Sequence, residues 1–132
     1  MDKKFDVVIV GTGAAGLYAA LNFPESVNIL LVSKRELQLS NSSLAQGGVA
    51  CVLDTVHDSY KLHITDTLIA GKYKNTLSAV EKLVTEGPSD VLKIKDLGVD
   101  FDLNEDGTMC KTLEAGHSRN RIVHHKDSTG KA

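Results

Sequence analysis

The feature that most constrains the fold is the segment GTGAAG at residues 11–16, which directly follows the apolar run Phe5 to Val10. In a Gly-x-Gly-x-x-Gly pattern, the first glycine permits a tight turn and the second lets a pyrophosphate approach the backbone. The third lets the following helix pack closely against the strand. The pattern is weak alone, and a glycine-rich structural turn is the other interpretation. Between a predicted strand and a predicted helix it indicates dinucleotide binding, with the phosphates at the positive end of the helix.

The segments around these glycines predict a β-α-β unit. Residues 5–10 are apolar and β-branched, which is typical of a strand buried on both faces. Residues 14–23 are rich in alanine and leucine and end at Pro24, so they predict a helix. Residues 27–32 (VNILLV) predict a second buried strand. A strand, helix and strand in this order place the two strands in parallel, which predicts an α/β, Rossmann-like fold.

The rest of the chain predicts two helices and a hairpin. Residues 48–53 fit either a short strand or packed irregular chain. Apolar residues at near-helical spacing predict helices over 58–70 and 76–97, the second with a break or bend near Gly87 and Pro88. Residues 99–113 predict a β-hairpin that turns at Asn104 to Gly107, because Asp-Gly is a favoured two-residue turn.

Composition limits the function classes. The chain has 132 residues, 42% hydrophobic and 24% charged, which is typical of one globular domain. Its net charge of −2 offers no basic field for nucleic acid or an anionic membrane. Without a long apolar stretch or a signal-peptide pattern, we expect a cytoplasmic protein. Cys51 and Cys110 match no metal or redox spacing and are expected to behave as small hydrophobes rather than as a disulfide.

The dinucleotide itself is ambiguous from the second strand. A carboxylate that would hold ribose hydroxyls is absent at the strand end, where Ser33, Lys34 and Arg35 stand instead. Two cations there fit the 2′-phosphate of NADP, and they also fit an ordinary solvated surface. A non-catalytic NADP-binding module is therefore one hypothesis.

The loop that follows favours a larger ligand. Residues 40–48 (SNSSLAQGG) combine hydroxyls, amides and a Gly-Gly pair and lead into an apolar segment. A flavin ring presents several acceptors and an N–H, so a loop packed against it needs polar groups and small residues. Ser42, Ser43 and Gln46 can supply the hydrogen bonds, and Gly47 and Gly48 the space. The alternative is a polar surface loop with Asn-Ser turns.

Four ordered segments carry a family resemblance: VVIVGTGAAGLYAAL, LLVSKRELQLSNSSLAQGGVA, DSYKLHITDTLIAG and LEAGHSRNRIVHHKDSTGKA. Together they resemble the N-terminal part of the L-aspartate oxidases, a branch of the succinate dehydrogenase/fumarate reductase flavoprotein family. The resemblance implies FAD as the cofactor and a partial FAD-binding domain over residues 1–132, with an inserted substrate-capping region beginning within 100–125. The FAD-binding residues expected from motif and resemblance are Gly11, Thr12, Gly13, Ala14, Ala15, Gly16, Lys34, Asn41, Ser42, Ser43, Leu44, Ala45, Gln46, Gly47 and Gly48.

One position distinguishes branches of that family. The membrane-bound members attach FAD covalently through a histidine in this loop, and this chain has Asn41 there. A carboxamide cannot form that bond. The resemblance therefore implies non-covalent FAD and the soluble oxidase branch.

The segment Leu113 to Arg121 resembles the family's Glu-Gly-Gly-His-Ser segment near the substrate. The match implies that Glu114 pairs with the ammonium group of L-aspartate, and that His117 and Ser118 contact substrate or flavin. Local hydrogen bonding within the loop is the plainer reading of those two residues. The chain departs from the family pattern at Ala115 and at the Arg119-Asn120 pair.

The resemblance implies oxidation of L-aspartate to iminoaspartate, with O2 or fumarate as the electron acceptor. This reaction serves the quinolinate branch of NAD biosynthesis, with quinolinate synthase as a partner. A soluble fumarate reductase or succinate dehydrogenase-type flavoprotein is the alternative. The acid/base arginine of the family is expected beyond residue 132, so we expect a truncated chain that is inactive alone and holds FAD weakly or not at all. The non-enzyme hypothesis is a folded or partly folded module that is stabilised by self-association through its exposed faces.

Two further patterns carry no function. His117, His124 and His125 lack supporting ligands at metal-site spacing, so no metal site is predicted. The segment DSTGKA resembles the end of a phosphate-binding P-loop, but His125 stands where that motif needs its first glycine.

Overall fold

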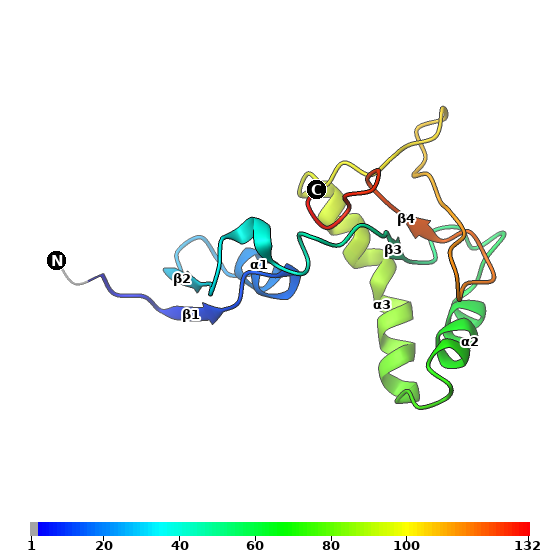
Figure 1. The fold of residues 1–132 in the computed structure, drawn as a ribbon, viewed down its shortest axis with the longest axis horizontal. Helices are drawn as coiled ribbons and strands as arrows, with labels where there is room; N and C mark the ends of the chain where they lie inside the picture. The colour runs from blue at the N-terminus through cyan, green and yellow to red at the C-terminus, as the bar shows by residue number, and fades with distance from the viewer. Residues whose placement is uncertain (1–2) are drawn as a thin grey trace. The chain divides into compact units, whose positions relative to one another are not determined.

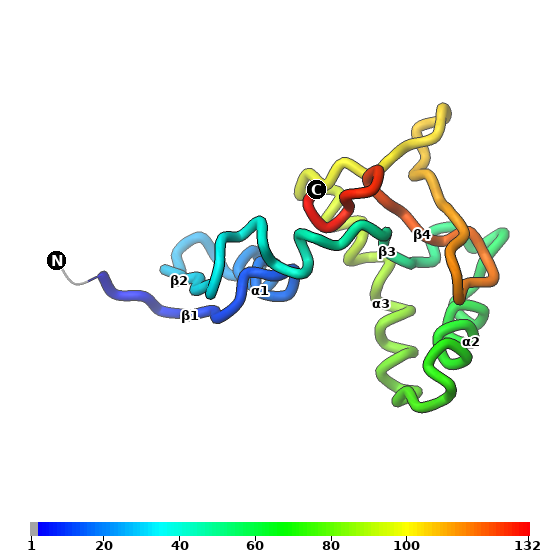
Figure 2. Tube along the Cα trace, viewed as in Figure 1, coloured from blue at the N-terminus to red at the C-terminus, as the bar shows by residue number. Residues whose placement is uncertain are grey.

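A computed structural model describes residues 3–132 of the chain. The chain divides into two compact units, one that ends at Gln46 and one that runs from Gly47 to Gly130. Figures 1 and 2 trace both units from the blue N-terminus to the red C-terminus. Each unit has its own small sheet, and each is described separately.

The first unit is the predicted β-α-β unit. Strand β1 (Val7–Val10) leads into helix α1 (Ala14–Leu21), and strand β2 (Ile29–Val32) follows. The two strands pair in parallel, with Val7 opposite Ile29 and Val10 opposite Val32. A short 3-10 helix, η1 (Leu37–Leu39), comes next. The predicted order and pairing are confirmed, and each of the three predicted elements is two residues shorter than predicted.

The prediction that both strands are buried on both faces is wrong for this chain. Val8 is 57% exposed and Val10 is 83% exposed, whereas Val7 and Ile9 are half-buried. The Ile9 side chain lies beneath Gly16 of α1, so the helix covers that face of the sheet. No element of this unit, within its described residues, covers the other face.

The second unit holds the hydrophobic core. Strand β3 (Val49–Ala50) pairs antiparallel with strand β4 (Ile122–Val123). Helices α2 (Tyr60–Ala70) and α3 (Leu77–Asp96) pack side by side (Figure 1). The central buried residues are Cys51, Val91, Phe101 and Val123. The short-strand alternative for residues 48–53 is therefore confirmed at Val49 and Ala50, while β4 had no prediction.

Helix α3 runs unbroken through Pro88, so the predicted break near Gly87 and Pro88 is wrong, while the bend stays a prediction. Its inward residues are spaced four, four and three apart, which places them on one face of the helix. They are Val80, Val84, Pro88 and Val91. Pro88 removes one backbone hydrogen bond, but its ring is buried on that face. Packing of the ring compensates for part of the loss.

The predicted hairpin is reduced to a single bridge between Leu103 and Met109, without strands. The Gly107 N–H donates to the Asn104 carbonyl at 2.9 Å, and the Asn104 N–H donates to the Thr108 carbonyl at 2.8 Å. Gly107 has φ +81°. The loop is thus a three-residue connection ending in a left-handed glycine rather than the two-residue Asp-Gly turn. The Asp106 carboxylate stabilises it by accepting from the N–H and hydroxyl of Thr108.

Both cysteines are free thiols. Cys51 is 1% exposed within the core. Burial raises the pKa of its thiol to about 11, although Lys111 opposes the shift. Cys51 therefore acts as a small hydrophobe, as predicted.

Candidate functional site

The Gly11–Gly16 turn needs its glycines for two physical reasons. Gly11 has φ +113°, a backbone conformation that side chains with a Cβ rarely adopt. A Cβ on Gly16 would lie 2.1 Å from the Gly11 carbonyl oxygen, so only glycine lets α1 start this close to β1. At its glycine positions the turn therefore presents only backbone at the N-terminus of α1. Helix N-termini leave N–H groups without intrahelical partners, which suits a phosphate.

The polar loop folds back onto this turn. The Ala14 N–H, the first of α1, donates to the Ser42 hydroxyl at 3.0 Å, although 28 residues separate them. A Cβ on Gly13 would also lie 3.0 Å from the Ser42 Oγ. Within the loop, the Ser43 N–H donates to the Ser40 hydroxyl at 3.1 Å. The sequence motif and the loop that were predicted to share one cofactor therefore meet within the first unit.

The rim of this site is open. The buried Thr12 hydroxyl donates to the Ser33 hydroxyl at 3.0 Å, which ties the glycine turn to the end of β2. Ser42 and Ser43 are half-buried. The remaining predicted cofactor residues of this unit with longer side chains are exposed: Lys34, Asn41, Leu44 and Gln46. Their contacts with a cofactor stay predictions.

The Gly-Gly pair belongs to the second unit, and its two members differ. A Cβ on Gly48 would lie 2.4 Å from the Val123 carbonyl oxygen, so the β3–β4 pairing itself requires this glycine. A Cβ on Gly47 would meet nothing within 4 Å. Of this pair, Gly47 is therefore the glycine that packing within the described structure does not require.

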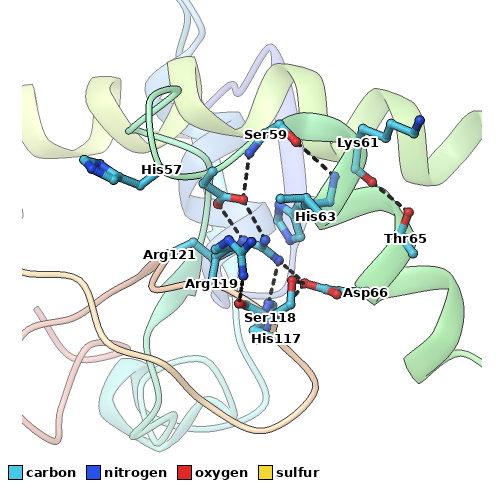
Figure 3. Close-up of polar contacts among 12 residues, drawn as sticks. His57, Ser59, Lys61, His63, Thr65, Asp66, His117, Ser118, Arg119 and Arg121 are labelled. Atoms are coloured by element: carbon cyan, nitrogen blue, oxygen red, sulfur yellow. Dashed lines mark hydrogen bonds and ion pairs between the residues drawn. The ribbon is translucent and has the colours of Figure 1, made fainter.

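The second unit contains a buried ion cluster that the sequence analysis missed. Arg121 is fully buried and donates from Nε and Nη2 to the two oxygens of Asp58, at 2.8 and 2.7 Å. Its Nη1 donates to the Asp66 Oδ2 at 2.6 Å. Figure 3 shows Arg121 between α2 and the loop that carries His117 and Ser118. A bidentate arginine–carboxylate pair of this kind is geometrically specific and strong.

This cluster fixes the predicted substrate segment. The Asp66 Oδ2 also accepts from the N–H and the hydroxyl of Ser118, both at 2.8 Å. The Arg121 Nη1 lies 3.3 Å from the His117 Nδ1. His117 and Ser118 thus take part in local hydrogen bonds within the second unit, and their contact with substrate or flavin stays a prediction. Glu114 is exposed on the same loop, and its carboxylate has no hydrogen bond or ion pair with any residue of 3–132.

The charges in the cluster support one another. Burial alone would raise the pKa of Asp66, but hydrogen bonds from Ser118 and Arg121 outweigh it and hold that pKa below its usual value. Burial would likewise raise the pKa of Asp58, but hydrogen bonds, mainly from Arg121, outweigh burial and hold that pKa below its usual value. Burial and the nearby Arg121 charge lower the pKa of His63, whose ring centroid lies 5.7 Å from that of His117. Both carboxylates are therefore ionised and His63 is neutral near neutral pH.

The missed cluster left a weak signal in the sequence. Arg121 directly precedes the apolar pair at 122–123, and Asp58 and Asp66 flank the apolar face of a predicted helix. Charged residues at the margin of buried segments are rarely buried unless paired. That rule could have indicated an ion pair, but only the fold identifies the partners.

Other features of the second unit are less specific. An open hollow of about 400 Å³ lies beside the cluster and is lined mainly by polar residues, among them Lys111, Asn104 and Arg119. Within residues 3–132, no three His, Cys, Asp or Glu side chains converge to form a metal site. No helix in the described part of the chain is long and apolar enough to span a membrane.

The comparisons with known proteins agree with this geometry. Residues 6–132 match the model of the FAD binding domain family. The chain is 47% identical over 131 residues to an L-aspartate oxidase of Clostridium perfringens and covers 29% of that relative. It is 47% identical over 128 residues to an L-aspartate oxidase of Acinetobacter baylyi and covers 23% of it.

Solved structures show the same fold. A Mycobacterium smegmatis Sdh1 structure in complex with UQ1 matches 96% of this chain with a TM-score of 0.88 and 32% identity. An E. coli quinol fumarate reductase matches 96% with a TM-score of 0.88 and 29% identity. The chain covers 22% of each.

The chain therefore belongs to the FAD-binding domain family, and its cofactor is FAD. It spans less than a third of the length of the curated relatives named above. The residues fit the cofactor, because the glycine turn brings the N-terminus of α1 close to β1 and the polar Ser42 loop lies beside it. The family match overturns the NADP-binding alternative.

Proposed function

We propose that this chain supplies the N-terminal FAD-binding part of a flavin-dependent L-aspartate oxidase, which converts L-aspartate to iminoaspartate. The observation that carries the proposal is the 47% identity, over 131 residues, to a relative of that name. O2 or fumarate is the proposed electron acceptor. The product suits the quinolinate branch of NAD biosynthesis, with quinolinate synthase as a partner and the cytoplasm as the location.

The residues of this chain divide the work between binding and orientation. Backbone N–H groups in the first turn of α1 beyond Ala14, whose own N–H donates to Ser42, would hold the FAD phosphates. The loop Asn41 to Gly48 would line the ring. Bound FAD would supply a two-electron acceptor for the hydrogen that leaves Cα as hydride. We propose that residues 100–125 begin the substrate-capping region. There Glu114, His117 and Ser118 would orient the substrate.

The Glu114 carboxylate is the proposed partner of the substrate ammonium group. It is exposed and has no protein partner within residues 3–132, so it can form a charge-assisted hydrogen bond with a ligand. A dicarboxylate without an amine gains nothing from this charge. Glu114 therefore favours aspartate over succinate or fumarate.

We also propose that FAD is bound non-covalently. Asn41 is exposed on the loop, and its carboxamide cannot make the covalent link of a histidine. Denaturing and precipitating the flavin-loaded protein with acid tests this. Flavin should remain in the supernatant, and flavin that precipitates with the protein would refute the proposal.

The 132 residues alone are not expected to catalyse the reaction or to hold FAD tightly, since the sheet of the first unit is exposed on one face. A suitable experiment is a hybrid in which this chain replaces its matching segment in the Clostridium perfringens relative. The hybrid should oxidise L-aspartate. The Glu114→Gln hybrid should lose about tenfold or more in kcat/KM for aspartate, because a hydrogen bond to a charged group is lost. Unchanged discrimination between aspartate and succinate would disprove the role of Glu114.

A second candidate is a soluble fumarate reductase or succinate dehydrogenase-type activity. The likeness to E. coli quinol fumarate reductase, with a TM-score of 0.88, favours it. The same hybrid cannot distinguish the two activities, because the relative supplies most of the substrate site. Any longer natural chain that contains this sequence would distinguish the two, by its relative rates with L-aspartate and succinate.

A further inference from the structure

The buried ion cluster controls more than the position of the Glu114–Ser118 loop. Asp66, Arg121, His117 and Ser118 form a connected set of hydrogen bonds in which the direction of each bond can be worked out (Figure 3). These bond directions decide which donor and acceptor atoms of the loop remain available to a ligand. The inference rests on the proposed function for the nature of the ligand, but not for the bond directions.

The arginine determines the state of His117. A guanidinium has only N–H donors, so the His117 Nδ1, 3.3 Å from the Arg121 Nη1, must accept and therefore carries no hydrogen. In a neutral imidazole the hydrogen then sits on Nε2. Arg121 is itself held in place by three shorter bonds to Asp58 and Asp66. His117 is left as a hydrogen-bond donor through Nε2.

The aspartate determines the state of Ser118. Asp66 is ionised, and a carboxylate only accepts, so the Ser118 hydroxyl must donate its hydrogen to the Asp66 Oδ2 at 2.8 Å. The backbone N–H of Ser118 is used by the same oxygen. The Ser118 Oγ can therefore offer a ligand only its lone pairs. It is left as an acceptor.

We infer that Arg121 and Asp66 are positioning residues that set the loop's hydrogen-bonding polarity, with His117 as a donor and Ser118 as an acceptor. A ligand that satisfies both needs an anionic or carbonyl group for His117 and an N–H group for Ser118. An α-amino acid with a second carboxylate carries both kinds of group. A dicarboxylate without an amine satisfies His117 but leaves the Ser118 oxygen facing an acceptor.

Nitrogen NMR of the histidine rings in the whole 132-residue chain tests the bond directions without any ligand. At a pH where the histidines are neutral, His117 should show hydrogen on Nε2 and none on Nδ1. His57 is a contrast in the same spectrum, because its Nδ1 lies 2.9 Å from the Asp54 carboxylate and must carry the hydrogen there. The His117→Asn variant identifies the signals by their loss. Hydrogen on the His117 Nδ1, or an even mixture of both forms, would overturn the inference.

A kinetic test separates this inference from the proposed function. In the hybrid enzyme, Ser118→Ala should weaken L-aspartate binding about tenfold, and leave inhibition by succinate within about twofold. Equal weakening of both ligands would contradict the acceptor role. A hybrid that binds flavin but oxidises no aspartate would count against the proposed function, while the ring NMR would still decide the polarity.

Discussion

The two units of this chain differ in how much of their structure is buried. The first unit has one buried residue among those described, Thr12, and its strand residues Val8 and Val10 are largely exposed. The second unit buries a core around Val91, Phe101 and Val123 and a fully paired arginine. The first unit is thus organised by the backbone geometry of its glycine turn, and the second by side-chain packing. Stability and cofactor binding are therefore expected to depend on different residues.

The largest effect should come from breaking the buried cluster. Arg121→Met leaves the carboxylates of Asp58 and Asp66 without their cation, which is expected to lower the free energy of unfolding by about 3–5 kcal/mol. Urea unfolding followed by far-UV circular dichroism measures it. Arg119→Met is the matched control, because Arg119 is exposed and, among residues 3–132, its side chain bonds only to the Ser118 carbonyl. Equal midpoints for the two variants would contradict a stabilising role for the cluster.

A smaller effect should separate the two units directly. Val84 is 2% exposed in the second unit, and Val10 is 83% exposed in the first. Val84→Ala removes two buried methyl groups and should cost about 2 kcal/mol, whereas Val10→Ala should change the free energy of unfolding by less than about 0.5 kcal/mol. The same unfolding assay compares them. If Val10→Ala were the more damaging change, the exposed face of β1 would be packed in solution, and self-association should then be tested.

The smallest effect is a pH dependence of the free energy of unfolding, and it arises in the second unit. Burial and Arg121 lower the pKa of His63 in the folded chain, so the unfolded chain takes up this proton first as pH falls. The contribution of His63 to stability is therefore complete above the unfolded value of about 6.5 and declines below it, by at most about 1.4 kcal/mol per pH unit. Unfolding measured from pH 7 down to 5 should show a shallower decline for His63→Gln. His57→Gln, at an exposed position, should keep the full decline.

The same contrast explains what the sequence could predict. The β-α-β order followed from local apolar runs and from glycines whose roles are set by backbone geometry, as Gly11 and Gly16 show. The helices followed from periodicity. Arg121 and Asp58 form a pair across 63 residues, and β4 is defined by its pairing with β3, which is distant in the sequence. Such partners depend on the fold, and the sequence alone does not identify them.

Within the candidate site, the sequence indicated which residues matter more reliably than it indicated which structural contacts require them. Ser42 was predicted to line a flavin, and in the structure it also accepts the first N–H of α1. Gly48 was predicted to give space to a cofactor, but it is required by the close approach of Val123. The loop at 117–118 was predicted as a site segment, while the Asp66 and Arg121 side chains that hold it were not.

The flavin content of the hybrid enzyme tests the central claim most directly, namely that the glycine turn of the first unit holds FAD. Gly16→Val places side-chain atoms where a Cβ alone would lie 2.1 Å from the Gly11 carbonyl oxygen, and Gly47→Ala meets nothing within 4 Å. Absorbance spectra should show flavin in the parent hybrid and no flavin with Gly16→Val, and far-UV circular dichroism should show that Gly47→Ala is folded. A Gly16→Val hybrid that retains as much flavin as the parent would contradict the account.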